Sequence, residues 1–297
     1  MRGRRMRVLV TGVTGFLGWR TATLLTERGH DVLGLARPGG AGRAHAEGVE
    51  AERVDAGDPA ARRLIEGRDA VLHFAGVPDP AAARRDPARA VRENAGTTVN
   101  LLDGCLEHGA ALIYPSTVRA ALEPPPDAYG LSKRLGEEAC RHHAARATVA
   151  RLTSVFGPGQ VAWEGATGAI AAFARRAIEG EPIVIPGDPG RVRDFVYVDD
   201  VVAALEAIAL QERWEETLTL ASGRPTPLIR AAQLVRDALG ADVAIETPGG
   251  ELPPGEGTGY PAEGDLARLG LTVRPIEDAV GSYVEWLRRH PAAQGSS

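Results

Sequence analysis

The sequence has little of what marks several common classes of protein. It contains only two cysteines, Cys105 and Cys140, and they do not form a Cys-x-x-Cys pair. Two cysteines cannot build a disulfide framework, so we interpret both as small core residues of a protein in a reducing compartment. No apolar run approaches the roughly 20 residues of a membrane span. The basic residues 1–7 are followed by only Val8–Val10 before Thr11, which is too short for the core of a signal peptide. We therefore expect a soluble, cytoplasmic protein.

An excess of positive charge is also missing. Lysine and arginine total 34, against 39 for aspartate and glutamate, which gives a net charge of −5. Because basic side chains drive polyanion binding, nucleic acid is not an expected partner. The 44% of hydrophobic and 25% of charged residues exclude a disordered or a fibrous chain. A length of 297 residues suits one large domain or two interlocked ones, and we expect no bound metal.

Short apolar runs alternate with amphipathic stretches through the first half of the chain. The runs are continuous, as in strands that are covered on both faces. They predict strands at 7–11, 31–36, 70–74, 111–115 and 148–152. Helices are predicted between them, at 16–28, 59–66, 87–107 and 129–145. Strand, helix, strand in this order predicts an α/β protein with a parallel, doubly wound sheet and right-handed crossovers.

The second half of the sequence loses this alternation, because glycine and proline become frequent after Leu152. We predict a smaller, interlocked C-terminal domain there. The expected division gives residues 1–153 and 195–222 to the main domain and residues 154–194 and 223–297 to the smaller one. The Pro- and Gly-rich stretch 247–259 is expected to be a mobile surface loop, and 292–297 a frayed tail.

Three glycines, Gly12, Gly15 and Gly18, follow the first strand directly and open the first helix. The first permits a tight turn, the second lets the backbone approach a pyrophosphate, and the third lets the helix pack on the sheet. The helix N-terminus at Phe16 and Leu17 adds free N–H groups and a partial positive charge. The pattern predicts a dinucleotide cofactor.

The spacing Gly-x-x-Gly-x-x-Gly, preceded by Thr11, resembles the short-chain dehydrogenase/reductase superfamily. The resemblance is to its extended branch, the NAD-dependent epimerase/dehydratase family, and it covers nearly the whole chain. The segments Val71–Gly76 and Asn94–Leu102 match that family's fourth strand with its turn and its central helix. Residues 193–201, Arg-Asp-Phe-Val-Tyr-Val-Asp-Asp-Val, are close to a further signature. The resemblance implies a Rossmann domain for the dinucleotide and a smaller domain for the substrate.

The end of the second strand bears on which dinucleotide is bound. An acidic residue there would accept from the ribose 2′-hydroxyl of NAD, but this chain has Ala36 followed by Arg37. An arginine would pair with a 2′-phosphate, so we favour NADP; an Arg37 that is merely exposed would keep NAD possible. The resemblance implies further cofactor contacts from the turns after the third and fourth strands and from the central helix. These are Asp55, Ala56, Phe74, Ala75, Gly76 and Asn94. We expect His73 to be a core histidine.

Tyr129 and Lys133 lie one turn apart on a single helix face. A neighbouring ammonium lowers the pKa of a phenol, which makes tyrosine useful for proton transfer near neutral pH. In the resembled family this pair transfers the proton and holds the nicotinamide ribose. A hydroxyl at the end of the fifth strand also binds the substrate oxygen there. We assign that catalytic role to Thr117, with Ser116 as the second choice and as a substrate contact.

Several residues bear on the substrate. Dehydratases of the resembled family follow the catalytic threonine with Asp-Glu, but here Val118 and Arg119 follow, so dehydration is not expected. Ser154 replaces an asparagine that binds the sugar nucleotide in the family. Arg193 matches the arginine that pairs with the substrate diphosphate, unless it forms a structural ion pair with Asp194 or another loop.

These residues predict an NADP(H)-dependent oxidoreductase acting on a nucleotide-activated sugar, by 4-ketoreduction. A 4-epimerase with tightly bound NAD(P) is the alternative. A reductase of a non-nucleotide ketone and a non-catalytic dinucleotide sensor are the remaining hypotheses. By analogy with the resembled family, we expect a homodimer that uses helices 87–107 and 129–145.

Overall fold

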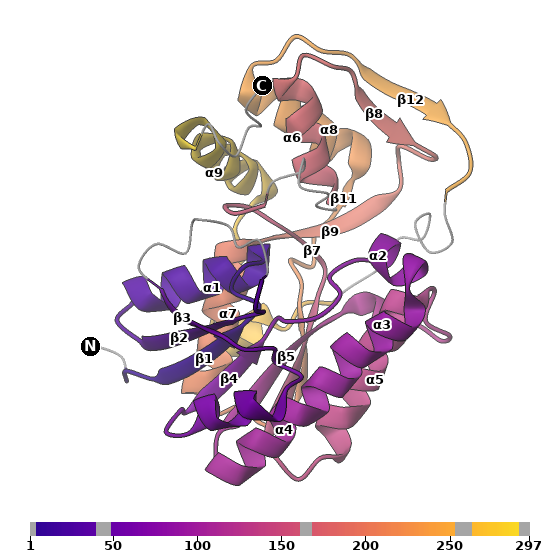
Figure 1. Cartoon of the computed structure of the whole chain (residues 1–297). Helices are drawn as coiled ribbons and strands as arrows, with labels where there is room; N and C mark the ends of the chain where they lie inside the picture. The colour runs from indigo at the N-terminus through magenta and orange to yellow at the C-terminus, as the bar shows by residue number, and fades with distance from the viewer. Residues whose placement is uncertain (1–3, 40–48, 161–167, 253–262, 291–297) are drawn as a thin grey trace. The chain divides into compact units, whose positions relative to one another are not determined.

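A computed structural model of the chain describes residues 4–39, 49–160, 168–252 and 263–290 (Figure 1). The chain divides into two compact units. The first comprises Met1–Leu152 and Val202–Thr219, and the second comprises Thr153–Val201 and Leu220–Ser297. The sequence predicts that the chain returns to the first domain at residue 195. In the structure, residues 195–197 instead pair within a sheet of the second unit, and the return begins at residue 202.

The first unit is built on a seven-stranded sheet in the order β10-β6-β5-β4-β1-β2-β3. Its strands are β1 (Arg7–Thr11), β2 (Asp31–Ala36), β3 (Glu50–Arg53), β4 (Ala70–His73), β5 (Ala111–Thr117), β6 (Ala147–Leu152) and β10 (Thr217–Leu220). The five pairings from β3 across to β6 are all parallel. The strand order reverses between β1 and β4, which is where doubly wound sheets bind ligands. The predicted fold class is confirmed.

The helices of the first unit contain two departures from the predicted pattern. They are α1 (Phe16–Glu27), η1 (Pro59–Ile65), α2 (Pro80–Arg85), α3 (Pro87–Val91), η2 (Arg92–Gly96), α4 (Thr97–His108), η3 (Val118–Ala121), α5 (Ala128–His142) and α7 (Val198–Leu210), which starts in the second unit. The segment 59–66 is a 3₁₀ helix, with Asp58 accepting from Ala60 N at its start. The predicted helix 87–107 is interrupted by the π turn η2, a feature that is frequent at functional sites.

The core of the first unit is apolar and lies on both faces of the sheet. Leu9, Val71 and Leu112, on three neighbouring strands, are completely buried. Because these strands are covered on both faces, their sequences are continuous apolar runs rather than alternating ones. Cys105 and Cys140 are free and buried, as expected for small core residues. None of the helices described here is long and apolar enough to cross a bilayer.

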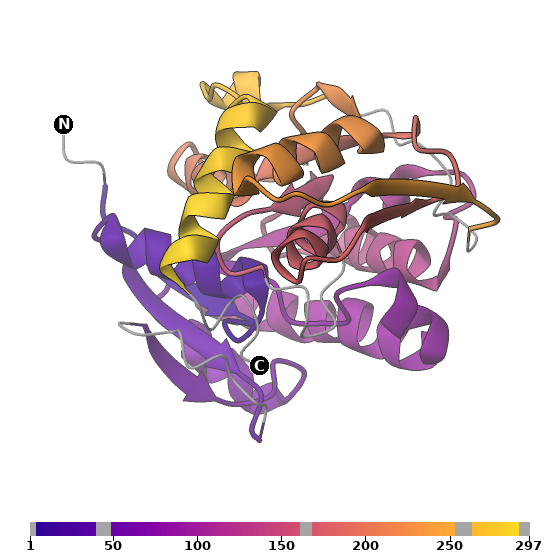
Figure 2. The same cartoon turned by 90° about the horizontal axis from the view of Figure 1, so that it is seen from above.

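The second unit has two small sheets, in the orders β11-β9-β7 and β12-β8. Its elements are β7 (Ser154–Phe156), α6 (Ala169–Ile178), β8 (Ile183–Pro186), β9 (Val192–Tyr197), β11 (Pro225–Pro227), α8 (Leu228–Leu239), β12 (Ile245–Gly249), η5 (Leu266–Leu269) and α9 (Ile276–Arg289). Figure 2 shows α8 and α9 packed side by side. Phe156 makes edge-on ring contacts with Tyr197 and Tyr283 in the core, at 5.8 and 6.2 Å between centroids.

The prediction of a surface loop over residues 247–259 is wrong for residues 247–249. Residues 247–249 complete β12, which pairs parallel to β8 with Ile245 opposite Ile183. Ile245 also packs against the buried cluster of this unit, so backbone pairing and burial outweigh the nearby proline and glycines. Residues 253–262 and the expected frayed tail at 292–297 lie outside the described residues.

Candidate functional site

The turn from β1 into α1 is shaped by its glycines. Gly12 has a φ of +70°, and a methyl group there would lie 2.8 Å from Ala75 N. A methyl group at Gly18 would lie 2.3 Å from the carbonyl oxygen of Gly12. In the described part of the chain no side chain caps the first turn of α1, which starts after Gly15. The N–H groups of this turn can therefore bind an anion, and the glycines give it room to approach.

The ends of β1 and β4 are joined by a buried network beneath this turn. Thr11 Oγ1 accepts from Ala75 N at 3.0 Å and is also hydrogen-bonded to His73 Nδ1 at 2.9 Å. Burial, followed by the charge of Lys133, lowers the pKa of His73 to about 3, so the ring is neutral. His73 Nε2 has no hydrogen-bond partner among the described residues. His73 is thus a core histidine, as expected. It lies beneath the turn of Gly12, Gly15 and Gly18, which we call the glycine cradle.

A hollow of about 260 Å³ opens between the ends of these strands. The predicted cofactor residues that line it are Gly12, Gly15, Arg37, Asp55, Ala56, Phe74, Ala75 and Gly76. Backbone donors at the cradle, a guanidinium at the end of β2 and a carboxylate after β3 suit the phosphates, the ribose and the base of a dinucleotide. The residues present therefore fit such a cofactor.

Arg37 has a partner that the sequence did not suggest. Its side chain is about half exposed, at 54%, and its Nη1 lies 3.3 Å from Glu93 Oε1. Glu93 also lines the hollow and pairs with Arg89 at 2.6 Å. Arg37 comes from the end of β2 and Glu93 from η2, so only the fold brings them together.

Asn94 braces the turn after β4. It is buried, and its Oδ1 accepts from Val77 N at 2.8 Å. Its Nδ2 donates to Val77 O at 3.2 Å and to Ser132 Oγ at 2.9 Å. Because the amide is used in these bonds, we interpret Asn94 as positioning the turn beside Gly76 against α5.

Lys133 is the only lysine of the chain, so the other 33 of its 34 basic residues are arginines. Its Nζ donates to Pro115 O at 2.8 Å and lies 4.6 Å from the centroid of the Tyr114 ring. Burial lowers the pKa of Lys133 to about 8, although Cys140 and Glu137 act in the opposite direction. An amine that titrates near neutral pH suits proton chemistry, which an arginine cannot provide.

The two hydroxyls at the end of β5 have different surroundings. Ser116 Oγ donates to Glu137 Oε1 at 2.6 Å, and both residues are buried. Thr117 is also buried, and among the described residues its Oγ1 accepts one long bond, of 3.3 Å, from Arg119 N. Successive side chains of a strand point to opposite faces. Ser116 therefore lies on the face of β5 that meets Glu137 of α5, and Thr117 lies on the opposite face. This arrangement favours Thr117 as the reacting hydroxyl.

The pKa of the Tyr129 phenol is shifted by groups other than Lys133, the one that the sequence predicts. The sequence predicts that Lys133 lowers the pKa of Tyr129. In the structure, burial raises that pKa above its ordinary value, and the charge of Arg119 acts against this shift. Asp79 and Asp127 raise it further. Lys133 is not among the groups that shift this pKa here, and its ammonium donates to Pro115 O.

Glu137 is a functional neighbour that the sequence analysis missed. It is fully buried and accepts from Arg151 Nη2 at 2.6 Å and from Arg141 Nη2 at 2.7 Å, in addition to Ser116. A glutamate four residues after Lys133, on the same face of α5, was the available signal. Its network fixes α5 to β5 and β6 beneath Lys133.

Ser154 and Arg193 lie in the second unit. Arg193 is in β9, opposite Thr226 of β11, and its Nη1 donates to Val192 O at 2.9 Å. Asp194 is buried, and its carboxylate accepts from Thr153 Oγ1 at 3.0 Å and from the Ser222 hydroxyl at 2.9 Å. The aspartate of this signature thus holds two loops of its own unit together.

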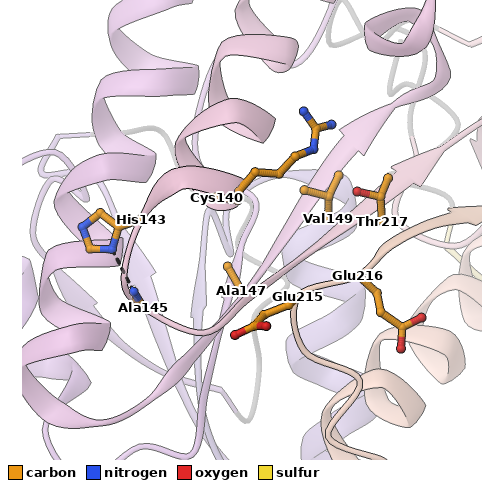
Figure 3. A pocket seen from close by; sticks show the side chains of 9 residues that line it. Cys140, His143, Ala145, Ala147, Val149, Glu215, Glu216 and Thr217 are labelled. Carbon is orange, nitrogen blue, oxygen red and sulfur yellow. Dashed lines mark hydrogen bonds between the residues drawn. The ribbon is translucent and has the colours of Figure 1, made fainter.

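A second hollow, of about 480 Å³, lies at the β6 and β10 side of the first unit (Figure 3). Cys140, Ala147 and Thr217 are among its lining residues. None of the predicted site residues lines it. The hollow at the β1 and β4 ends is the one lined by predicted cofactor residues, and the predicted catalytic residues Thr117, Tyr129 and Lys133 line neither hollow.

Comparison with known proteins agrees with this geometry. The family model "NAD dependent epimerase/dehydratase family" matches residues 8–218. The chain is 25% identical to the dTDP-4-dehydro-6-deoxy-D-allose reductase of Streptomyces bikiniensis, over 95% of this chain and 96% of that protein. It is 27% identical to the dTDP-glucose 4,6-dehydratase of Streptomyces griseus, over 95% and 94%.

A solved structure agrees as well. The UDP-glucose 4-epimerase of Thermotoga maritima, in complex with UDP-glucose, superposes with a TM-score of 0.86 and 26% identity. The match covers 96% of this chain and all of that one. The predicted family is confirmed: the chain is an enzyme of the NAD-dependent epimerase/dehydratase family.

Proposed function

We propose that the chain is an NADP(H)-dependent reductase of a 4-keto group on a nucleotide-activated sugar. The observation that carries the proposal is the placement of Thr117, Tyr129 and Lys133. They stand at the end of β5 and on the first turns of α5, in the same unit as the glycine cradle. A strand-end hydroxyl, a phenol and an amine in this arrangement suit proton exchange with a carbonyl oxygen.

Each of the three side chains has a separate task in this proposal. When bound, a nicotinamide would supply hydride chemistry at the carbonyl carbon. Thr117 donates a hydrogen bond that orients the carbonyl oxygen, and Tyr129 gives that oxygen its proton, so the carbonyl becomes an alcohol and the phenol a phenolate. Lys133 uses one of its three N–H groups on Pro115 O, which leaves two for the ribose hydroxyls.

Arg37 supports NADP over NAD. It follows Ala36 at the end of β2 and lines the hollow, where its guanidinium can pair with a 2′-phosphate. On the substrate side, Arg193 supplies a permanent charge for a diphosphate, and Ser154 a hydroxyl for the nucleotide sugar. The similarity over nearly the full length to an allose reductase supports the same reaction class.

The alternative function is 4-epimerisation with a retained cofactor. Two observations favour it: the likeness to a UDP-glucose 4-epimerase, and the ion pair of Arg37 with Glu93. A carboxylate beside Arg37 weakens its attraction for a 2′-phosphate and thereby favours NAD. The same three residues would serve both reactions.

The test is to incubate the protein with nucleotide-linked 4-keto sugars and nucleotide sugars, each with NADPH or NADH. Loss of reduced-nicotinamide absorbance with a 4-keto sugar supports the reductase, whereas isomer exchange seen by NMR without net consumption supports the epimerase. Tyr129→Phe should abolish either reaction and leave cofactor binding intact. Reduction of ketones that carry no nucleotide, with none of the nucleotide sugars turned over, would refute the substrate class. Full turnover by Tyr129→Phe would refute the catalytic role.

We also propose a homodimer formed through α4 and α5. Among the described residues, the exposed large hydrophobic side chains are Val99, Leu106, Leu131 and Leu135, and all four lie on these two helices. Exposed apolar side chains on two helices that contact each other favour an interface there. Light scattering should give twice the chain mass for the wild type and the single-chain mass for a Leu106→Glu, Leu131→Glu double variant. A monomeric wild type would contradict the proposal.

A further inference from the structure

A buried arginine packs against the turn of α5 that carries the proposed catalytic tyrosine. Arg119, in η3, forms an ion pair with Asp127, and their side chains are only 10% and 4% exposed. Taking two charges out of water is costly, so such a pair is retained only where its geometry is good. Asp127 stands two residues before Tyr129 in the chain, at the start of α5.

The geometry of this pair is fixed on both sides. Asp127 is the N-cap of α5, and its other carboxylate oxygen accepts from Gly130 N at 2.8 Å. A methyl group at Gly130 would lie 3.2 Å from Arg119 O and 3.4 Å from Arg119 Cβ. The absence of a side chain at Gly130 therefore lets η3 pack closely on the first turn of α5, which carries Tyr129.

Charged and titratable groups approach Tyr129 from several elements. They are Arg119 from η3, Asp79 from the start of α2, Tyr114 from β5, and Asp127 from the start of α5. Tyr129 packs on a small apolar cluster formed by Val77, Ala83 and Ala90, so little solvent screens these charges. Asp79 is held in place because it accepts from Ala82 N at 2.8 Å.

We propose that Arg119, held by Asp127, is a positioning residue that stabilises the phenolate of Tyr129 formed during proton transfer. The inference rests on the proposed function, in which Tyr129 gives its proton to the substrate oxygen as hydride reaches the neighbouring carbon. Two carboxylates oppose the phenolate, and Lys133 is engaged with Pro115 O. The guanidinium of Arg119 supplies the opposing positive charge.

The direction of the electrostatic effect supports this role. After burial, which raises the pKa of Tyr129, the charge of Arg119 is the largest influence on it, and it lowers that pKa. An opposite charge within a few ångströms shifts a pKa by roughly one to three units. Removal of this charge should therefore make the phenol a weaker acid by on the order of one unit.

Tyr129 can be titrated directly, without any substrate. The chain has five tyrosines, and incorporation of 3-fluorotyrosine gives each a ¹⁹F signal that moves when its phenol ionises. Fluorine also makes the phenol more acidic, which brings the titration into a milder pH range. Tyr129→Phe identifies the signal. We expect the titration midpoint to rise by on the order of one pH unit in Arg119→Met and to recover by at least half in Arg119→Lys.

Arg134→Met is the matched control. Arg134 also holds η3 from α5, since its Nε donates to Ala120 O at 2.7 Å, but it is not among the groups that act on Tyr129. Its removal should leave the midpoint unchanged. Equal midpoints in wild type and Arg119→Met, or equal shifts in Arg119→Met and Arg134→Met, would overturn the proposal.

If Arg119→Met does not fold, a second variant can be measured in its place. Arg119→Gln removes the charge but can still donate a hydrogen bond to Asp127, so the midpoint should rise. A fall or no change would count against the proposal. If a substrate is turned over, the limb of the pH–rate profile that reports Tyr129 should move upwards in Arg119→Met by the same amount as the midpoint. If no nucleotide sugar is turned over by the wild type, the proposed function fails, while the ¹⁹F titration still decides the role of Arg119.

Discussion

The glycine cradle after β1 and the charged first turns of α5 belong to the same unit but are built on different physical grounds. The cradle depends on backbone and on missing side chains, since a methyl group at Gly12 or Gly18 would collide with neighbouring backbone atoms. The α5 region depends on charges held out of water, at Arg119, Asp127 and Lys133. Substitutions in the glycine cradle should therefore act through steric clashes, with effects that do not depend on pH. Substitutions in the α5 region should act through charge, with effects that depend on pH.

The largest effect is expected for the buried carboxylate of α5. Glu137→Gln removes the charge that holds Arg151, Arg141 and Ser116, and should lower the free energy of unfolding by about 3 kcal/mol. Urea unfolding would measure it. The neighbouring Glu138→Gln is the control, because that exposed glutamate pairs only at the surface and should cost less than about 1 kcal/mol. Equal losses at both positions would remove the distinction between buried and exposed charge on this helix.

The next effect depends on pH. The pKa of Lys133 is lowered in the folded protein from 10.5 to about 8. Between these values the unfolded chain binds more protons, so the stability of the wild type should rise with pH across this interval relative to Lys133→Met. The gain should be about 2 to 3 kcal/mol, measured by urea unfolding of both proteins at about pH 7 and about pH 10.

The same pKa can be observed directly, because a ¹³Cε-lysine label gives one side-chain signal in a chain with one lysine. A midpoint near 8 would agree with the stability difference. A midpoint near the ordinary value of 10.5, with parallel stabilities, would show that this amine is not desolvated.

A smaller loss of stability, without pH dependence, is expected in the cradle. Gly18→Ala forces a methyl group to within 2.3 Å of Gly12 O, which should cost about 1 to 3 kcal/mol and impair NADPH binding equally at about pH 7 and about pH 9. Calorimetric titration would measure the binding. Gly281→Ala in α9, where a methyl group meets open space, should instead stabilise the protein by about 0.5 to 1 kcal/mol. If NADPH binding by Gly18→Ala changed with pH, the effect in the cradle would not be purely steric, which would contradict the proposed difference between the two regions.

The smallest effect concerns cofactor choice. Arg37→Ala should weaken NADPH binding by about tenfold and NADH binding by less than about threefold, because only the former has a 2′-phosphate. Glu93→Gln is the companion variant, since it releases Arg37 from its ion pair and should strengthen NADPH binding. Tighter binding of NADH than NADPH by the wild type would point to the epimerase alternative.

The parts of this molecule that the sequence predicted are those governed by local pattern. β1 and β2 begin and end where the apolar runs do, because buried parallel strands need continuous apolar sequence. β3, at residues 50–53, is an exposed edge strand with charged side chains and offers no such run. The π turn at 92–96 contains Asn94, which is hydrogen-bonded to Val77 and Ser132, residues distant in the sequence.

The candidate site divides in the same way. The glycine spacing and the Tyr129–Lys133 pair are local motifs, so their sequence predicts them. The groups that set the charge around Tyr129 come from three separate segments, at Asp79, Arg119 and Asp127. Nothing in the local sequence tells which cation approaches a phenol, because that depends on how η3 packs on Gly130. The protonation behaviour of the site therefore required the fold.

Because arginine occupies 33 of the 34 basic positions, the protein offers a single side-chain amine, at Lys133. Acetylation, glycation or any other amine-directed modification of a side chain thus has one possible target, and it lies within the proposed catalytic set. For most proteins such damage is spread over many surface lysines and is largely silent. Here every chain that is modified on a side-chain amine would be modified at Lys133, because the protein has no other lysine that could react instead.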